Sequence, residues 1–427
     1  MPTRTPDPIV GKGRFDMFED IRAAPRAFKV LITSALIENM AFGLIIPLLT
    51  IYMVSDIGIS ESLSGVVLAG YTLSGIPGMI FGGMLVDKIG RRVVLLMSLG
   101  CMSLTVFLYF YAFDFITFLL VAMADSFVGS LYMPAANAMI ADVIPSRDRP
   151  KAYSTLRIAW NVGMIFGPAA GAVIVAAYSI KVLFLFGALI LLGAFFMNLV
   201  FIPETKPEET GEAVTFRKVM AVSGDRPFLM MCSMSAVLFL CMTQFMSALP
   251  IYMVADLGLD ETSVGPLWIL SGLMIVLLQL WITSQMVKFR RSVVLMSGQI
   301  VMGVGIGLVY LATDMLTLSA CVIVMTLGEL IYMSILGAIV ADMAPEDQRG
   351  IYMGFSGFMQ TLGWGVGMFL GLWMLDVLPQ RETMWLIFGT VAIATSVAYI
   401  RFGRMIGPVK DHPVKHDAAG KEPAPGH

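Results

Sequence analysis

The chain alternates long apolar stretches with short polar segments from end to end. Twelve stretches can each form a helix that crosses a hydrocarbon core of about 30 Å, since about 20 residues suffice and a helix satisfies its own backbone hydrogen bonds. They lie near residues 28–54, 62–86, 93–112, 115–140, 153–178, 182–202, 227–254, 263–287, 293–312, 316–340, 350–375 and 383–400. Weak alternation with a period of two residues argues against a β-barrel. The pattern predicts an all-α integral membrane protein with twelve transmembrane helices.

Composition and charge agree with this class and add an orientation. With 58% hydrophobic and 14% charged residues, and a mean hydropathy of +0.83, the chain has too little charge for a soluble domain of this length. All Lys and Arg except Arg157, Lys181 and Arg381 fall at the termini or in the loops after even-numbered helices. The positive-inside rule therefore predicts cytoplasmic termini in a multi-pass cell-membrane protein. Residues 1–27 are polar and show no cleavable signal peptide.

The chain also repeats itself at an offset of 200 residues. Ile51–Val54 recurs as Ile251–Val254, and Ala141–Asp142 recurs as Ala341–Asp342. Two parallel copies of one unit in a membrane protein are the signature of a two-bundle transporter. The predicted organisation is an N-terminal segment (1–27), a six-helix bundle (28–202), a cytoplasmic linker (203–226), a second six-helix bundle (227–402) and a tail (403–427).

A motif stands between the second and third helices. It runs from Gly83 through Asp87, Lys88 and Gly90 to Arg91 and Arg92. This run resembles the G-x-L-x-D-[RK]-x-G-R-R pattern of the major facilitator superfamily. The resemblance implies the two-bundle fold of that family and alternating access as its mode of transport.

The resemblance also implies a cytoplasmic gate. In the family the Asp sits near the N-terminus of helix 11, where a carboxylate gains from the helix dipole, and the Arg residues pair with acids on neighbouring helices. Asp87, Arg91 and Arg92 are then gate residues, with Asp142 as a candidate partner. The second copy keeps Arg290 and Arg291 without the Asp, which predicts an asymmetric latch. The alternative is a turn whose basic residues only set topology.

Helix 5 carries a second family pattern. Gly163, Gly167, Pro168 and Gly171, followed by Ala172, resemble the G-x-x-x-G-P-x-x-G-G motif of the antiporters of this superfamily. Glycines four residues apart share one helical face and let a neighbouring helix approach closely, and we expect that face to pack across the interface between the bundles. Ordinary small-residue packing is the alternative. The chain departs from the antiporter branch at Asp125, which stands where those proteins carry an Arg four residues before a Gly.

Four ionisable side chains lie well inside the predicted spans. They are Glu38, Asp125, Arg157 and Glu329. Burying each in a membrane is costly, so each marks a pathway or a proton relay by default, and none recurs at the offset of 200 residues. Structural ion pairs are the alternative, and Arg157 could pair with Glu38 or extend to the cytoplasm.

The two acids of the first half are expected to lie at the same depth in the membrane. Counting along their helices places Glu38 and Asp125 near the midplane, and like charges at close range disfavour double ionisation. The resemblance implies that helices 1, 4, 7 and 10 line a central cavity, so Glu329 would face it as well. Helical spacing predicts as further cavity residues Phe42, Tyr132, Gln244, Met325, Tyr332 and Met333. Acids among aromatics and methionines suit lipophilic cations, although such stripes also occur in ordinary cores.

These features predict a secondary active transporter, not an enzyme, that exports amphipathic or cationic small molecules in exchange for protons. The histidines all lie in the tail, so proton carriers inside the membrane must be carboxylates. The expected partners are a small-molecule substrate, protons and membrane lipid, with no nucleic acid, cofactor or metal, and the chain is expected to be a monomer. Open alternatives are an importer or facilitator of a metabolite, a lipid translocation protein and a non-transporting membrane sensor.

Overall fold

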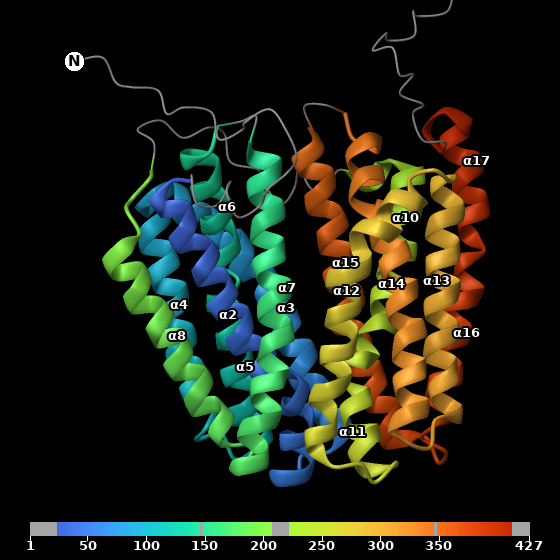
Figure 1. Ribbon diagram of the computed structural model, residues 1–427, viewed down its shortest axis with the longest axis horizontal. Coiled ribbons are helices and arrows are strands. Elements are labelled where there is room, and N and C mark those ends of the chain that lie inside the picture. The colour runs from blue at the N-terminus through green and yellow to red at the C-terminus, as the bar shows by residue number, and fades with distance from the viewer. Residues whose placement is uncertain (1–23, 146–147, 207–221, 346–347, 412–427) are drawn as a thin grey trace, which may run out of the picture. The chain divides into compact units, whose positions relative to one another are not determined.

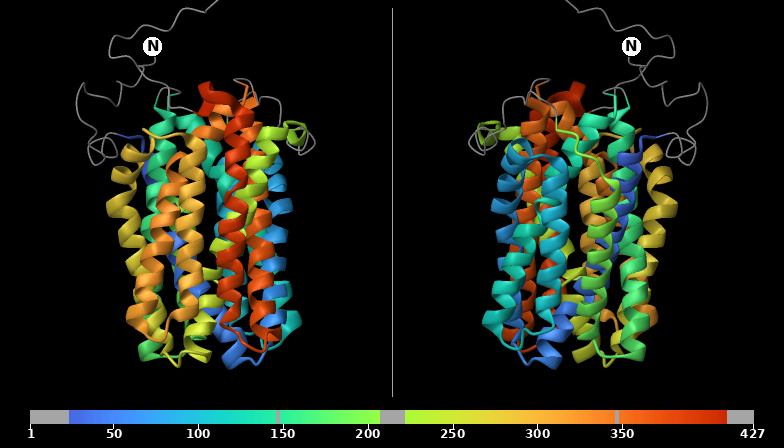
Figure 2. Two further views of the ribbon diagram at one scale, coloured as in Figure 1. Left: turned by 90° about the vertical axis from the view of Figure 1, so that its right-hand side faces the viewer. Right: turned by 90° about the vertical axis from the view of Figure 1, so that its left-hand side faces the viewer.

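The computed structural model describes residues 24–145, 148–206, 222–345 and 348–411. Over these ranges the chain is helical, and long rods are joined by short turns (Figures 1 and 2). The first half contains α2 (Arg26–Ile51), α3 (Glu61–Ile89), α4 (Arg91–Tyr109), α5 (Phe115–Gly129), α6 (Tyr132–Val143), α7 (Arg149–Ala177) and α8 (Val182–Phe201). The second half contains α10 (Arg226–Met242), α11 (Ala248–Ala255), α12 (Val264–Met286), α13 (Arg291–Leu308), α14 (Met315–Met343), α15 (Arg349–Val377), α16 (Thr383–Ser396) and α17 (Ala398–Asp411).

The predicted membrane spans are confirmed. Within the described residues, twelve helical segments are long and apolar enough to cross a membrane, the first from Arg26 to Asp56 and the last from Thr383 to Gly407. Large apolar side chains cover their outward faces, as Leu280 (83% exposed) and Leu316 (80% exposed) illustrate. Such surfaces suit contact with acyl chains. Most of the predicted N-terminal segment, linker and tail falls on residues 1–23, 207–221 and 412–427, outside the described ranges. Residues 403–411, predicted as the start of the tail, instead belong to α17.

Capping residues explain where several helices begin. Asp114 and Thr117 form a capping box at the start of α5, and Asp314 and Thr317 form the same box at the start of α14. Hydrogen bonds from the backbone N–H and hydroxyl of Thr317 hold the pKa of the Asp314 carboxyl below its usual value. The two boxes lie 200 residues apart, so the repeat extends to the helix caps.

Contacts group the chain into two units that do not coincide with the two copies of the repeat. The first unit joins residues 1–214 with 243–273 and 364–381, and the second holds 215–242, 274–363 and 382–427. α11, the first part of α12 and the last part of α15 therefore pack with the helices of the first copy. The division into two bundles at the linker stays a prediction. All contacts described below lie within a single unit.

Candidate functional site

Two carboxyl groups of the first unit face one small cavity. Glu38 comes from the middle of α2 and Asp125 from the last turns of α5. Asp125 is 7% exposed, and the hydroxyl of Thr105 on α4 donates a hydrogen bond of 2.5 Å to its Oδ1. Glu38 is half-buried, with the Asn39 side-chain amide 3.5 Å from its Oε2. The structure thus brings together the two acids for which the sequence predicts a shared depth.

The cavity between them is the size of a water molecule. Its volume is about 20 Å³, which is enough for about one water. Apart from the two acids and the hydroxyl of Tyr109, its walls are apolar and include Phe42, Ile45 and Met102. A space of this size fits a proton carried on a carboxyl group, or a small ion, far better than it fits a drug-sized molecule.

The electrostatic surroundings of the pair contain hydroxyls and no lysine or arginine among the residues that line the cavity. Asp125 interacts with Glu38, Tyr71 and Tyr109, and Glu38 also interacts with Tyr132. A second negative charge in this low-dielectric space is opposed by the first, because the described residues that line the cavity include no Lys or Arg to compensate it.

The other two predicted charges lie elsewhere. Arg157 is an exposed residue of α7, and among the described residues it has no ion pair or hydrogen bond, so the possible pairing with Glu38 is not made. Glu329 is half-buried in α14 of the second unit. Its predicted place beside the acids of the first half stays a prediction.

Most of the predicted cavity residues are packed inside their own unit instead. Tyr132 is 1% exposed, and its hydroxyl lies 3.4 Å from the carbonyl oxygen of Leu31. Tyr332 is fully buried, and its hydroxyl lies 2.7 Å from those of both Ser235 and Tyr399. Their hydroxyls are satisfied by neighbouring helices, so these rings hold helices together and do not line an open cavity.

Met325 and Gln244, also predicted to line the cavity, are likewise buried among neighbouring helices. Met325 is 3% exposed and packs against the glycine face of α13 at Gly305. Gln244 is buried, and its amide donates a 2.8 Å hydrogen bond to the carbonyl oxygen of Gly367. Of the predicted cavity residues, Phe42 lines the carboxyl cavity, and Met333 is half-buried.

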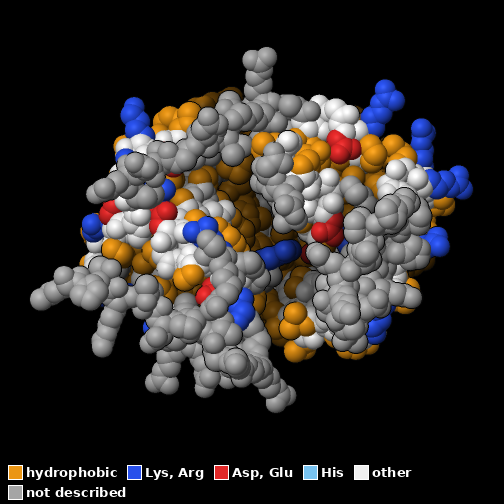
Figure 3. Space-filling view, turned by 90° about the horizontal axis from the view of Figure 1, so that it is seen from above, with side chains coloured by type: hydrophobic (Ala, Val, Ile, Leu, Met, Phe, Trp, Pro, Cys, Tyr) orange, Lys and Arg blue, Asp and Glu red, His pale blue; other side chains and the backbone are white. Residues whose placement is uncertain are grey.

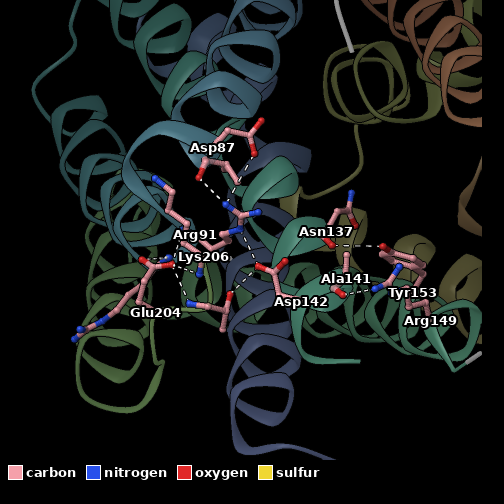
Figure 4. Close-up of polar contacts among 12 residues, drawn as sticks. Asp87, Arg91, Asn137, Ala141, Asp142, Arg149, Tyr153, Glu204 and Lys206 are labelled. Atoms are coloured by element: carbon pink, nitrogen blue, oxygen red, sulfur yellow. Dashed lines mark hydrogen bonds and ion pairs between the residues drawn. The ribbon is translucent and has the colours of Figure 1, made fainter. Parts of the chain in front are cut away.

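At the end of the helices where the chain leaves α8, the motif residues form a network around Arg91 (Figure 4). Arg91 is 5% exposed; its Nε donates to Asp142 Oδ2 at 2.8 Å and its Nη1 to the carbonyl oxygen of Val86 at 3.1 Å. Asp87 lies 3.9 Å from the same guanidinium. Arg92 instead donates to the carbonyl oxygen of Leu199 at 2.7 Å. The approach of Asp87 to the start of the eleventh span, which is α15, stays a prediction.

Glu204, which the sequence did not predict as a gate residue, completes this network. Its carboxylate accepts hydrogen bonds from the backbone N–H groups of Arg91 (2.9 Å) and Arg92 (3.2 Å) and thereby caps the start of α4. It closes over Gly90, whose φ of 103° and missing side chain leave room for it. Thr205 adds a 3.1 Å bond to Asp142. Gly83, in contrast, has open space where a side chain would be.

The second half has a matching latch. Arg291 on α13 pairs with Asp342 at 2.5 Å, and Asp411 caps α13 by accepting from the backbone N–H and hydroxyl of Ser292 at 2.8 and 2.9 Å. The predicted asymmetry is therefore limited to the position of Asp87. In the end-on view of Figure 3, Lys and Arg side chains lie among acidic and hydrophobic ones.

The antiporter-type glycines pack against α2, which belongs to the same copy of the repeat. A Cβ on Gly163 would meet the carbonyl oxygen of Leu36 at 2.5 Å, and one on Gly167 would meet that of Met40 at 2.6 Å. The glycine face thus closes the contact between α2 and α7, in place of the predicted contact across the bundles. Next to it, the carbonyl oxygen of Pro168 lies close to Gly265 at the start of α12.

At the opposite end of the helices, Arg381 joins three segments of the first unit. It binds Glu61 at the start of α3 (2.7 Å) and Asp256 just after α11 (3.3 Å). The backbone N–H of Ser62 adds a 3.3 Å bond to Asp376 at the end of α15. We call Arg381, Glu61 and Asp256 the outer clasp, since the positive-inside rule predicts that this end faces outward.

Comparison with known proteins agrees with this architecture. The chain is 27% identical over 88% of its length to the uncharacterized MFS-type transporter YttB of Bacillus subtilis, covering 95% of that protein. It is 25% identical over 79% of its length to a Na(+), Li(+), K(+)/H(+) antiporter of Planococcus maritimus, covering 87% of it. Over 40% of the chain and 44% of the relative, it is 29% identical to the quinolone resistance protein NorA of Staphylococcus aureus.

Solved structures show the same fold at low sequence identity. A POT family transporter superposes with a TM-score of 0.75 at 15% identity, over 90% of this chain and 99% of that one. The nucleoside transporter NupG gives 0.75 at 14%, over 88% and 98%. The family model described as Major Facilitator Superfamily matches residues 31–284 and 231–425, and with the twelve helices and the Arg91 network this establishes that the chain belongs to the major facilitator superfamily.

Proposed function

We propose that this secondary transporter exports amphipathic or cationic small molecules in exchange for protons by alternating access. The observation that carries the proposal is the pair of carboxyl groups, Glu38 and Asp125, on one water-sized cavity with no basic side chain among its lining residues. Because a second charge there is opposed by the first, the pair is suited to take up a proton and release it as the surroundings change.

The antiporter direction draws support from two further observations. The glycine and proline pattern of α7 resembles that of antiporters, and the relatives include a quinolone resistance protein and a cation/proton antiporter. The substrate itself does not enter the small cavity. It binds elsewhere and competes with the proton by changing how the helices around Asp125 pack.

The test uses purified protein in proteoliposomes with an acidic interior. Proteins inserted with their outer end toward the lumen then accumulate a lipophilic cationic dye as protons leave. We expect Glu38→Gln and Asp125→Asn each to lower gradient-driven accumulation at least about tenfold, since each removes a proton-carrying group. The exposed carboxyl variant Asp260→Asn serves as the control and retains wild-type transport. Wild-type accumulation by the double variant Glu38→Gln, Asp125→Asn would refute the coupling role.

A second candidate is exchange of alkali cations for protons at the same pair. It is favoured by the similarity to the Na(+), Li(+), K(+)/H(+) antiporter and by the size of the cavity, which suits an ion with little of its hydration shell. The same liposomes distinguish it, because addition of NaCl or KCl in the absence of dye would then dissipate the pH gradient, and Asp125→Asn would abolish this response. Uptake of a neutral metabolite without proton movement would instead support an importer.

A further inference from the structure

One face of α4 contacts both the end of α5, which carries Asp125, and α6. Arg91, Ser98, Met102 and Thr105 are spaced by seven, four and three residues, which places them on a single helical face. Thr105 donates to Asp125 on α5, and Arg91 donates to Asp142 on α6. The candidate proton site and the candidate cytoplasmic latch are therefore both held by the same face of one helix.

Between these two contacts the partner helix is broken. α5 ends at Gly129 and α6 begins at Tyr132, with a tighter turn in which the N–H of Leu131 bonds to the carbonyl oxygen of Val128 at 3.3 Å. At such a turn the regular bonding of the carbonyl groups is interrupted, and inside a membrane they depend on donors within the protein. Ser98, fully buried on α4, supplies one: its hydroxyl lies 2.8 Å from the carbonyl oxygen of Val128 and 3.4 Å from that of Gly129.

The second copy of the repeat lacks both the break and the donor. α14 runs without interruption from Met315 to Met343. The residue equivalent to Ser98 is Gly298, which packs directly on the backbone of α14 at Tyr332 and Gly328. Gly305 and Met325 replace Thr105 and Asp125, yet the pair of Arg291 and Asp342 is kept. The two copies thus share the latch and differ in what connects it to the membrane interior.

We propose that Ser98 is the positioning residue of a joint between α5 and α6 that transmits the ionisation state of Asp125 to the pair of Arg91 and Asp142. The inference rests on the proposed function, because it takes Asp125 as a group that gains and loses a proton. The groups that face Asp125 are Glu38 from α2, Tyr71 from α3, and Thr105 and Tyr109 from α4.

The joint works through the contacts of α4. An ionised Asp125 is a strong acceptor for the Thr105 hydroxyl, and its protonation weakens that attachment of α5 to α4. A continuous helix would carry the resulting displacement along its whole length as a rigid body. With a break, Ser98 can keep the carbonyl groups at the joint satisfied while α5 and α6 change their mutual angle, so the carboxylate of Asp142 moves relative to Arg91.

The experiment compares Ser98→Ala and Ser98→Gly with Ser103→Ala. Ser103 is the matched control: it is a buried serine of the same helix whose hydroxyl also donates to a backbone carbonyl, that of Ala188 at 2.9 Å, but on α8. Hydrogen exchange of the full-length protein in nanodiscs is measured at acidic and alkaline pH. The readout is the difference between the two pH values, corrected for intrinsic exchange, for peptides covering residues 115–129 and 132–143.

In the wild type both segments are expected to show a pH-dependent difference. In both Ser98 variants we expect the response of residues 132–143 to be lost while that of 115–129 remains, and dye transport to fall about tenfold, the effect of losing one buried hydrogen bond. Ser103→Ala keeps both responses. Binding of the dye is expected to stay within about twofold in all variants, because the hydroxyls of Ser98 and Ser103 are occupied by backbone carbonyl groups of neighbouring helices.

The following results would overturn either the joint or the proposed function. A full response of residues 132–143 in Ser98→Ala, or its equal loss in Ser103→Ala, overturns the joint. If Asp125→Asn retains proton-driven transport, the proposed function fails, whereas the joint alone fails if Asp125→Asn abolishes transport and the Ser98 variants transport normally. Should Ser98→Ala not fold, Ser98→Gly takes its place, since glycine is the residue that the second copy accommodates at this position.

Discussion

Arg91 and Arg291 show how one residue type serves two different environments. Arg91 is almost completely buried and donates to a carboxylate and a backbone carbonyl, with a second carboxylate nearby. For Arg291 the described partner is Asp342, whose side chain is 49% exposed. Solvent screens an exposed pair, while a buried guanidinium that loses an acceptor remains desolvated.

Arg91→Lys is therefore expected to destabilise the protein by about 1–3 kcal/mol, because a lysine ammonium cannot reach the acceptors that the guanidinium bridges. Transport should fall with it. Arg291→Lys is the matched control and should cost under about 1 kcal/mol. Thermal unfolding in detergent measures both variants, and equal losses would contradict the larger contribution expected of the buried Arg91.

The acids of the cavity could be predicted from the sequence, since a carboxylate inside an apolar span stands out whatever surrounds it. Their hydrogen-bond partners could not. Thr105 is an ordinary residue of an apolar helix, and Glu204 is one of several charges after α8. The tyrosines were misplaced for a physical reason: helical spacing gives the face on which a ring lies but not which neighbouring helix covers it.

At the scale of helices, the contact of α2 with α7 depends on the absence of side chains. The backbones approach so closely at Gly163 and Gly167 that a Cβ would overlap with carbonyl groups of α2. Backbone cannot move aside as a side chain can. The spacing of the glycines predicted a close contact, but it did not identify α2 as the partner.

Gly167→Ala should lower stability by about 1–3 kcal/mol, in spite of alanine's higher helix propensity, because overpacking must separate the two helices. The control is Gly193→Ala on α8, where a Cβ meets nothing within 4 Å and where alanine should leave stability unchanged or raise it slightly. Melting temperatures of the purified variants decide the comparison. A stable Gly167→Ala protein would mean that the two helices have room to separate at little cost.

For the whole molecule, the outer clasp ties segments far apart in sequence to one end of the first unit. Arg381 and Lys181 occupy equivalent positions of the repeat, yet only Arg381 bridges two acids; the ammonium of Lys181 lies 4.4 Å from the centre of the Phe110 ring. Hydropathy predicted the twelve spans because it reports burial in lipid. It could not predict which helix ends close together, since that depends on the conformational state.

Breaking the clasp should favour the conformation in which this end is open. Arg381→Gln is expected to raise the labelling rate of a cysteine placed at Ser62 by about tenfold, in a background without native cysteines, because a partly exposed ion-pair network is worth about 1 kcal/mol or slightly more. Lys181→Gln should leave the rate unchanged. Identical labelling in the two variants would show that Arg381 does not hold this end closed.

Because Glu204 caps α4, it limits where the chain can be divided into two separately expressed halves. If the two halves are expressed as separate polypeptides, the first must extend at least to Lys206, because Glu204 and Thr205 complete the fold around Arg91 and Asp142. A fragment that stops at Phe201 would contain every apolar span of the first copy and still lack part of its latch. Complementation between fragments is thus governed by a few residues that a hydropathy plot assigns to the linker.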